Sequence, residues 1–113
     1  MSNVYKNAFY LPTTTANTTV YTCNATARAI IQNIQITNST TTGNTVKAYI
    51  FSSTAGTTYT ISYASITGPT ICNLAAGPIV LQENDAILLS ASSTSNVSGT
   101  LAIMEVNRSA VSK

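Results

Sequence analysis

The sequence contains no histidine and no tryptophan, and only 7% of its 113 residues are charged. Without histidine, the chain cannot form a nucleophile–histidine dyad or the imidazole ligand set of most transition-metal sites. Its carboxylates are Glu83, Asp85 and Glu105. So few titratable groups predict a protein that is not an enzyme and has no catalytic residues, no cofactor and no metal ligands.

Two of the carboxylates, Glu83 and Asp85, lie in one polar corner with Asn84 between them. Neighbours in a hairpin corner do not flank a substrate as the carboxylate pair of a glycoside hydrolase must. Their oxygens could contribute to a calcium site, which needs about six to eight ligands. The favoured interpretation is a solvated turn, because Asn and Asp hydrogen-bond locally and tolerate turn geometry. We expect Glu105 to point outward from a strand.

The positive charges do not cluster along the sequence. The five cations are Lys6, Arg28, Lys47, Arg108 and Lys113. Nucleic-acid grooves need several cations on one face, so we expect no nucleic-acid partner. The apolar runs are too short to span a bilayer, and the N-terminal residues lack the apolar core of a signal peptide. We therefore expect no membrane partner.

Cysteine is also scarce, with only Cys23 and Cys72. The two could form a disulfide, but a cytosolic protein would keep both reduced. Each lies beside an apolar strand residue. We favour free, buried thiols.

Charged residues make up about 25% of a typical soluble domain. In this sequence serine, threonine and asparagine take their place. A surface of hydroxyl and amide groups can be covered by another subunit at modest cost, because no ionised group has to be desolvated. A secreted or adhesin-like surface has a similar composition. We favour an assembling protein, and expect a homo-oligomer.

The aromatic residues are six tyrosines and two phenylalanines. They could include a platform that stacks on sugars, although the absence of tryptophan weakens a lectin-like interpretation. Core packing with the tyrosine hydroxyls at the rim is the commoner use of such residues, and is the one favoured here.

Short apolar runs separated by turn residues about every ten positions predict the fold. Threonine, valine, isoleucine and tyrosine, all strand formers, dominate these runs. The pattern predicts an all-β protein: a single antiparallel β-sandwich or jelly roll of about eight or nine short strands. The expected strands are 3–11, 19–23, 28–37, 46–51, 58–63, 70–74, 79–81, 86–89 and 100–106.

Three of these segments give finer expectations. The runs 86–89 and 100–106, separated by a polar corner, indicate an antiparallel pair. A bulge near Gln32 would reconcile the two halves of 28–37, since one extra residue flips the register. In 58–63 strict alternation predicts one buried and one wet face. The domain division that follows is an N-terminal strand or arm at 1–15, a β-sandwich at 16–107 and a C-terminal tail at 108–113.

The order of these pieces resembles small structural proteins of tailed bacteriophages. The residues that carry the resemblance are Val4–Ala8, Leu11 with the threonine run that follows it, Val20–Cys23, Ala29–Asn38 and Leu81–Ile87. The resemblance covers most of the chain, includes no catalytic motif and transfers no functional residue.

The resemblance implies a β-sandwich virion component. It would be a capsid decoration or cement protein that binds the shell as a homo-oligomer, with the major capsid protein or other virion proteins as partners. Its location would be the virion, assembled in the host cytoplasm. The alternatives are a tail fibre-base or adaptor subunit and a carbohydrate-binding module in host recognition.

Overall fold

The computed structural model describes residues 2–39, 43–67, 69–92 and 97–107, which form nine strands. The strands are β1 (Ser2–Tyr10), β2 (Thr18–Thr22), β3 (Ala27–Asn38), β4 (Asn44–Ser52), β5 (Thr57–Ile66), β6 (Thr70–Asn73), β7 (Ile79–Leu81), β8 (Ala86–Ala91) and β9 (Val97–Asn107). No helix long and apolar enough to cross a membrane occurs within these ranges.

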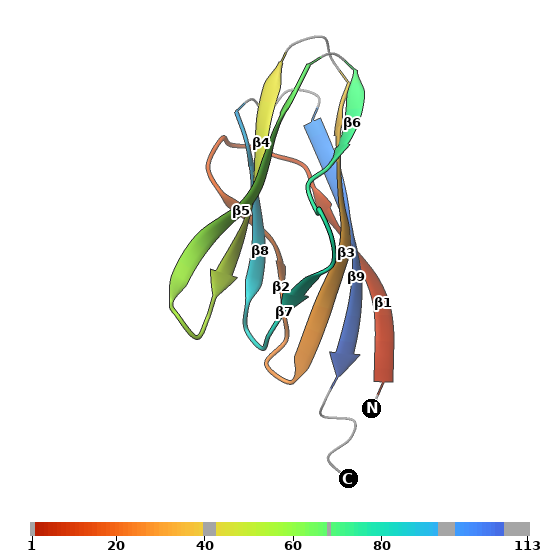
Figure 1. Ribbon diagram of the computed structural model, residues 1–113, viewed down its shortest axis with the longest axis vertical. Helices are drawn as coiled ribbons and strands as arrows, with labels where there is room; N and C mark the ends of the chain where they lie inside the picture. The colour runs from red at the N-terminus through yellow and green to blue at the C-terminus, as the bar shows by residue number, and fades with distance from the viewer. Residues whose placement is uncertain (1, 40–42, 68, 93–96, 108–113) are drawn as a thin grey trace.

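The strands form two antiparallel sheets that face each other, as Figure 1 shows. Sheet A has the order β1-β9-β3-β6, with β7 also paired to β3, and sheet B has the order β2-β8-β4-β5. The pairings are nested along the chain, from its two ends toward its middle. They join β1 with β9, β2 with β8, β3 with β6 and β7, and β4 with β5. This nesting is the connectivity of a jelly roll, so the predicted fold class is confirmed.

The expected pairing of the runs 86–89 and 100–106 is wrong. The first run lies in β8 of sheet B and the second in β9 of sheet A. The two strands therefore do not form a hairpin. Both strands are nevertheless central, because each has a neighbour on both sides.

The predicted bulge in β3 is confirmed. Ile31 pairs with Ile103, but the next pair along the ladder joins Asn33 to Ala102, so Gln32 is the extra residue. The extra residue lets Ile31 and Ile34 both point into the core, and both are fully buried.

The core fills the space between the sheets with aliphatic side chains from their central strands. Burial of each large aliphatic side chain contributes about 1.5–3 kcal/mol relative to its exposure. Fully buried residues from sheet A include Ile31, Ile34, Ile36, Leu101 and Ile103, and those from sheet B include Val46, Ala48, Ile87 and Leu89.

The buried face that alternation predicted for 58–63 is not found, because residues 58–61 are all exposed. Tyr59, Ile61 and Tyr63 are exposed, while Ile66 is buried. The ladder between β4 and β5 shifts register between Ala48 and Tyr49, so the residues on the two sides of the shift do not follow one alternating series. Tyr63 lies opposite the exposed Lys47, whereas Tyr59 lies opposite Ile50, which packs against the core.

The N-terminal segment is an integral strand. All nine residues of β1, from Ser2 to Tyr10, pair with β9. The division into residues 1–15, 16–107 and 108–113 stays a prediction, and the expected tail lies outside the described residues.

Candidate binding surface

The corner that contains Asp85 is a structural turn with a buried carboxylate. One oxygen of Asp85 accepts hydrogen bonds from the Ser53 amide at 3.0 Å and the Ser53 hydroxyl at 3.2 Å. The other accepts from the Gln82 amide at 3.0 Å. The carboxylate therefore ties the loop after β7 to the turn after β4. The expectation of a solvated turn is wrong for Asp85, which is 8% exposed.

The same corner also connects to the end of β2. Asn84 adopts a left-handed backbone conformation with a φ of 68°, which Asn tolerates better than most residues. Its amide donates to the Cys23 carbonyl at 3.1 Å, and the Cys23 amide donates to the Asp85 carbonyl at 2.8 Å. Glu83 lies 3.5 Å from Arg28. Among the described residues, no group of three or more His, Cys, Asp or Glu side chains could hold a metal ion.

Glu105 does not point outward as expected. It lies on the core side of β9 and is 7% exposed. The hydroxyl of Tyr21 in β2 donates a hydrogen bond to one carboxylate oxygen, and the ammonium of Lys6 lies 3.2 Å from the other. Burial and the bond to Glu105 raise the pKa of Tyr21 well above its ordinary value. This group joins the two sheets at their β1–β2 side.

Both cysteines are free thiols, as expected. Cys23 is buried and its thiol donates to the Ala27 carbonyl at 3.3 Å, whereas Cys72 is half-buried. Burial raises the pKa of both thiols. Protonated thiols of this kind are poor nucleophiles, so neither residue suggests chemistry.

The exposed apolar side chains of the described chain gather on or beside the edge strands. Contrary to the expectation of core packing, half of the aromatic residues are among them. The exposed set is Val4, Tyr5, Phe9 and Leu11 on or just after β1, Tyr59, Ile61 and Tyr63 on β5, Ile71 on β6 and Val80 on β7. They belong to edge strands of both sheets, and exposed apolar side chains that gather into a patch mark interaction sites.

The outer face of sheet A carries almost no charge. By strand alternation, Arg28 is the charged side chain that the described residues place on this face, and it lies beside Glu83. The remaining outward positions on β1, β9 and β3 are aromatic, aliphatic, hydroxyl or amide. A partner could therefore cover this face without desolvating unpaired ions.

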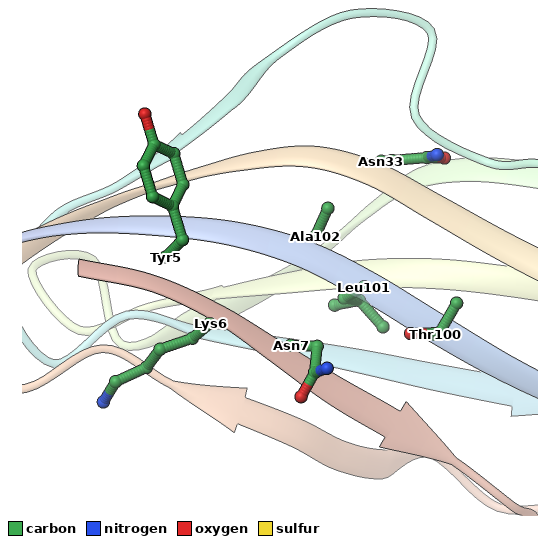
Figure 2. A pocket seen from close by; sticks show the side chains of 7 residues that line it. All are labelled: Tyr5, Lys6, Asn7, Asn33, Thr100, Leu101 and Ala102. Atoms are coloured by element: carbon green, nitrogen blue, oxygen red, sulfur yellow. The ribbon is translucent and has the colours of Figure 1, made fainter.

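A shallow hollow of about 480 Å³ lies on this outer face. Its lining includes Tyr5 from β1, Ala102 and Thr100 from β9 and Asn33 from β3. Figure 2 shows Tyr5 and Ala102 on one side of the sheet, with Lys6 directed to the other side. The Tyr5 side chain is 76% exposed and lies opposite Met104, whereas the small Ala102 lies opposite Asn7.

Asn33 adds an unusual feature to the hollow. Its Oδ1 atom is buried and has no hydrogen-bond partner among the described residues. Buried polar atoms are normally satisfied, so an orphan beside a hollow suggests a bound water or ligand group. The bulge predicted at Gln32 was the one sequence feature that indicated an irregular backbone next to Asn33. No sequence feature indicated that Tyr5, from a distant strand, would line the same hollow.

No protein-family model matches the sequence, and no curated protein matches it. Among solved structures, the fold is similar to that of a chain in the structure of infectious bursal disease virus, Gx strain. The TM-score is 0.50, with 16% sequence identity over 92% of this chain. A chain in the structure of the Gt strain has a TM-score of 0.39 and 11% identity, also over 92% of this chain. The protein spans 30% of the length of each of these chains.

Proposed function

We propose that the protein is a non-enzymatic structural component of a virus particle. The observation that carries this proposal is the nearly uncharged outer face of sheet A, where exposed apolar side chains lie among hydroxyls and amides. Such a face suits burial against another protein, since its polar groups can exchange water for partner atoms at little cost. The described residues of this face offer no arrangement of titratable groups for catalysis.

The fold supports the same proposal. Jelly rolls recur in viral capsid domains and in lectins, so the topology alone favours these two classes. The similarity to a chain in the structure of infectious bursal disease virus is a likeness of fold, and it agrees with the first class.

The finer proposal rests on the resemblance to tailed-bacteriophage proteins. In it, the protein decorates or cements the capsid as a homo-oligomer, with the major capsid protein as its main partner and the virion as its location. Its action would be mechanical, because interfaces of about 1,600 Å² repeated over a shell stabilise that shell by binding its assembled form.

Binding to particles tests this proposal. Purified protein is mixed with particles that lack it and then sedimented, and we expect saturable co-sedimentation together with a higher disruption temperature of the particle. A Tyr5→Lys variant introduces a charge on the exposed face and should bind more weakly. A Thr54→Lys variant, in the exposed turn after β4, is the matched control. Failure of the wild-type protein to bind would contradict the proposal.

A carbohydrate-binding module is the second candidate, favoured by the hollow. An exposed tyrosine ring beside amide and hydroxyl side chains matches the mixed surface of a sugar, and about 480 Å³ lies within the usual size of ligand sites. Glycan-array binding that is lost in both Tyr5→Ala and Asn33→Ala would establish this function. A shell protein should show no such binding.

A further inference from the structure

The four edges of the two described sheets differ in how well they are protected. Exposed edges of sheets tend to pair with other chains unless they are short, bulged, charged or interrupted. In sheet A, β6 and β7 are short and separated by a segment that contains Gly77 and Pro78. In sheet B, β2 has five residues and a register shift between Thr19 and Tyr21. These edges are poorly suited to pairing.

The β1 edge has none of these protections. Its nine residues pair with β9 without any register shift, whereas the ladder of the longer edge strand β5 is interrupted opposite Ala48 and Tyr49. Figure 1 shows β1 as the outermost strand beside β9, and no described strand pairs with its other edge. The one charge of β1, Lys6, is neutralised by Glu105 of its own chain.

We propose that β1 pairs antiparallel with β1 of a second copy, around a two-fold axis at Asn7. The two A sheets then form one continuous sheet. In this register Asn7 lies opposite Asn7 of the second copy, and Tyr5 lies opposite Phe9 of the second copy. Aromatic cross-strand pairs stabilise antiparallel strands, and both rings are more than 70% exposed in the single chain.

Charge disfavours one of the two neighbouring registers. Moving the axis to Lys6 places the two Lys6 side chains directly opposite each other, which is unfavourable for like charges. With the axis at Asn7, each Lys6 lies opposite Ala8 of the second copy. The same axis also pairs two apolar residues on the inner side, Val4 with Tyr10 of the second copy.

The expected interface is small. Tyr5 and Phe9 expose roughly 200–350 Å² per copy, and pairing of the strand backbones adds to this. A specific interface needs about 500 Å² from each partner, so this interface lies near the lower limit of size. We therefore expect weak association, with a Kd on the order of 10 µM. Only the use of this dimer on a shell depends on the proposed function. Self-association is measured on the isolated protein, and its failure would leave particle binding untouched.

Cysteine cross-linking tests the register. In a Cys72→Ser background, Asn7→Cys should form a disulfide-linked dimer on mild oxidation, because the two introduced residues face each other across the axis. Ala102→Cys is the control. It is exposed on the same outer face and pairs with Asn7 of its own chain, but lies roughly 14 Å from its counterpart in the dimer. Equal cross-linking of both variants, or none at Asn7→Cys, would overturn the register.

Sedimentation velocity tests the association itself. The wild-type protein should convert from monomer to dimer over roughly 1–100 µM. Phe9→Lys should raise the Kd at least about tenfold, since it removes one ring of each pair from an exposed position that does not contribute to the core. A monomeric wild-type protein across this range, or unchanged dimerisation of Phe9→Lys, would overturn the proposal.

Discussion

The hydroxyl of Tyr21 donates a hydrogen bond to the carboxylate of Glu105, and this contact joins β2 of sheet B to β9 of sheet A. The strands are 84 residues apart in the chain at this point. Since Glu105 is almost fully buried, its charge depends on Tyr21 and Lys6 for compensation.

Replacement of Tyr21 by Phe should destabilise the fold by about 1–3 kcal/mol, because a buried carboxylate oxygen loses its donor. Tyr63→Phe is the matched control at an exposed position and should change stability by less than about 0.5 kcal/mol. Urea unfolding followed by circular dichroism measures both. Equal stabilities for the two variants would show that the contact has no energetic role.

Alkaline pH should destabilise the protein. Burial raises the pKa of Tyr21, Tyr10 and both thiols, so the folded state keeps protons that the unfolded state releases. The stabilisation is complete below the ordinary values of 9.0 for a thiol and 10.0 for tyrosine, and is lost as pH rises above them. Each such group lowers stability by at most about 1.4 kcal/mol per pH unit. Melting temperatures from pH 7 to 11 should fall most steeply above pH 9, and less steeply in Tyr21→Phe.

The Asp85 corner should matter for stability and not for ligand binding. Asp85→Ala removes three hydrogen-bond acceptor contacts and leaves the Ser53 and Gln82 amides without their partner, so we expect a loss of about 2–4 kcal/mol. Glu83→Gln keeps the size of a half-buried neighbour and should cost less than about 1 kcal/mol. Thermal melts with and without calcium complete the test. A melting temperature that rises with calcium in wild type but not in Asp85→Ala would contradict the structural role.

Gly99 is required by a close approach of three strands. A Cβ atom at this position would lie 2.6 Å from Cδ1 of the fully buried Ile36 and 3.2 Å from the Gln35 carbonyl oxygen. Gly99→Ala should therefore destabilise the protein by about 1–3 kcal/mol. Gly77→Ala, where an added Cβ meets nothing within 4 Å, should be neutral or slightly stabilising. Denaturant midpoints of the two variants give the comparison directly.

The positions of the strands could be predicted because their signals are local. Alternation, turn residues and β-branched side chains act within a few residues, and they placed all nine strands and the bulge at Gln32. Pairing depends on contacts far apart in the sequence. The two strands that flank residues 92–96 are adjacent along the chain, yet they belong to different sheets.

Whether a side chain faces the core or the solvent was also difficult to predict at the edges of the sandwich. Tyr63 and Ser62 alternate as expected, but the larger Tyr63 is exposed and the smaller Ser62 is half-buried. Glu105 is the converse case, a charge on the buried side. Its partners Tyr21 and Lys6 come from two other strands, so no local pattern could identify them. The hollow beside Tyr5 depends on the same kind of distant approach.

The copy number of the protein in purified particles tests the central claim most directly. Quantitative mass spectrometry against the major capsid protein gives this ratio. Decoration of the shell predicts on the order of hundreds of copies per particle, because a symmetric shell repeats each docking site. A handful of copies would contradict decoration and favour the tail fibre-base or adaptor role. Absence from particles would contradict the proposal that this is a structural component of a virus.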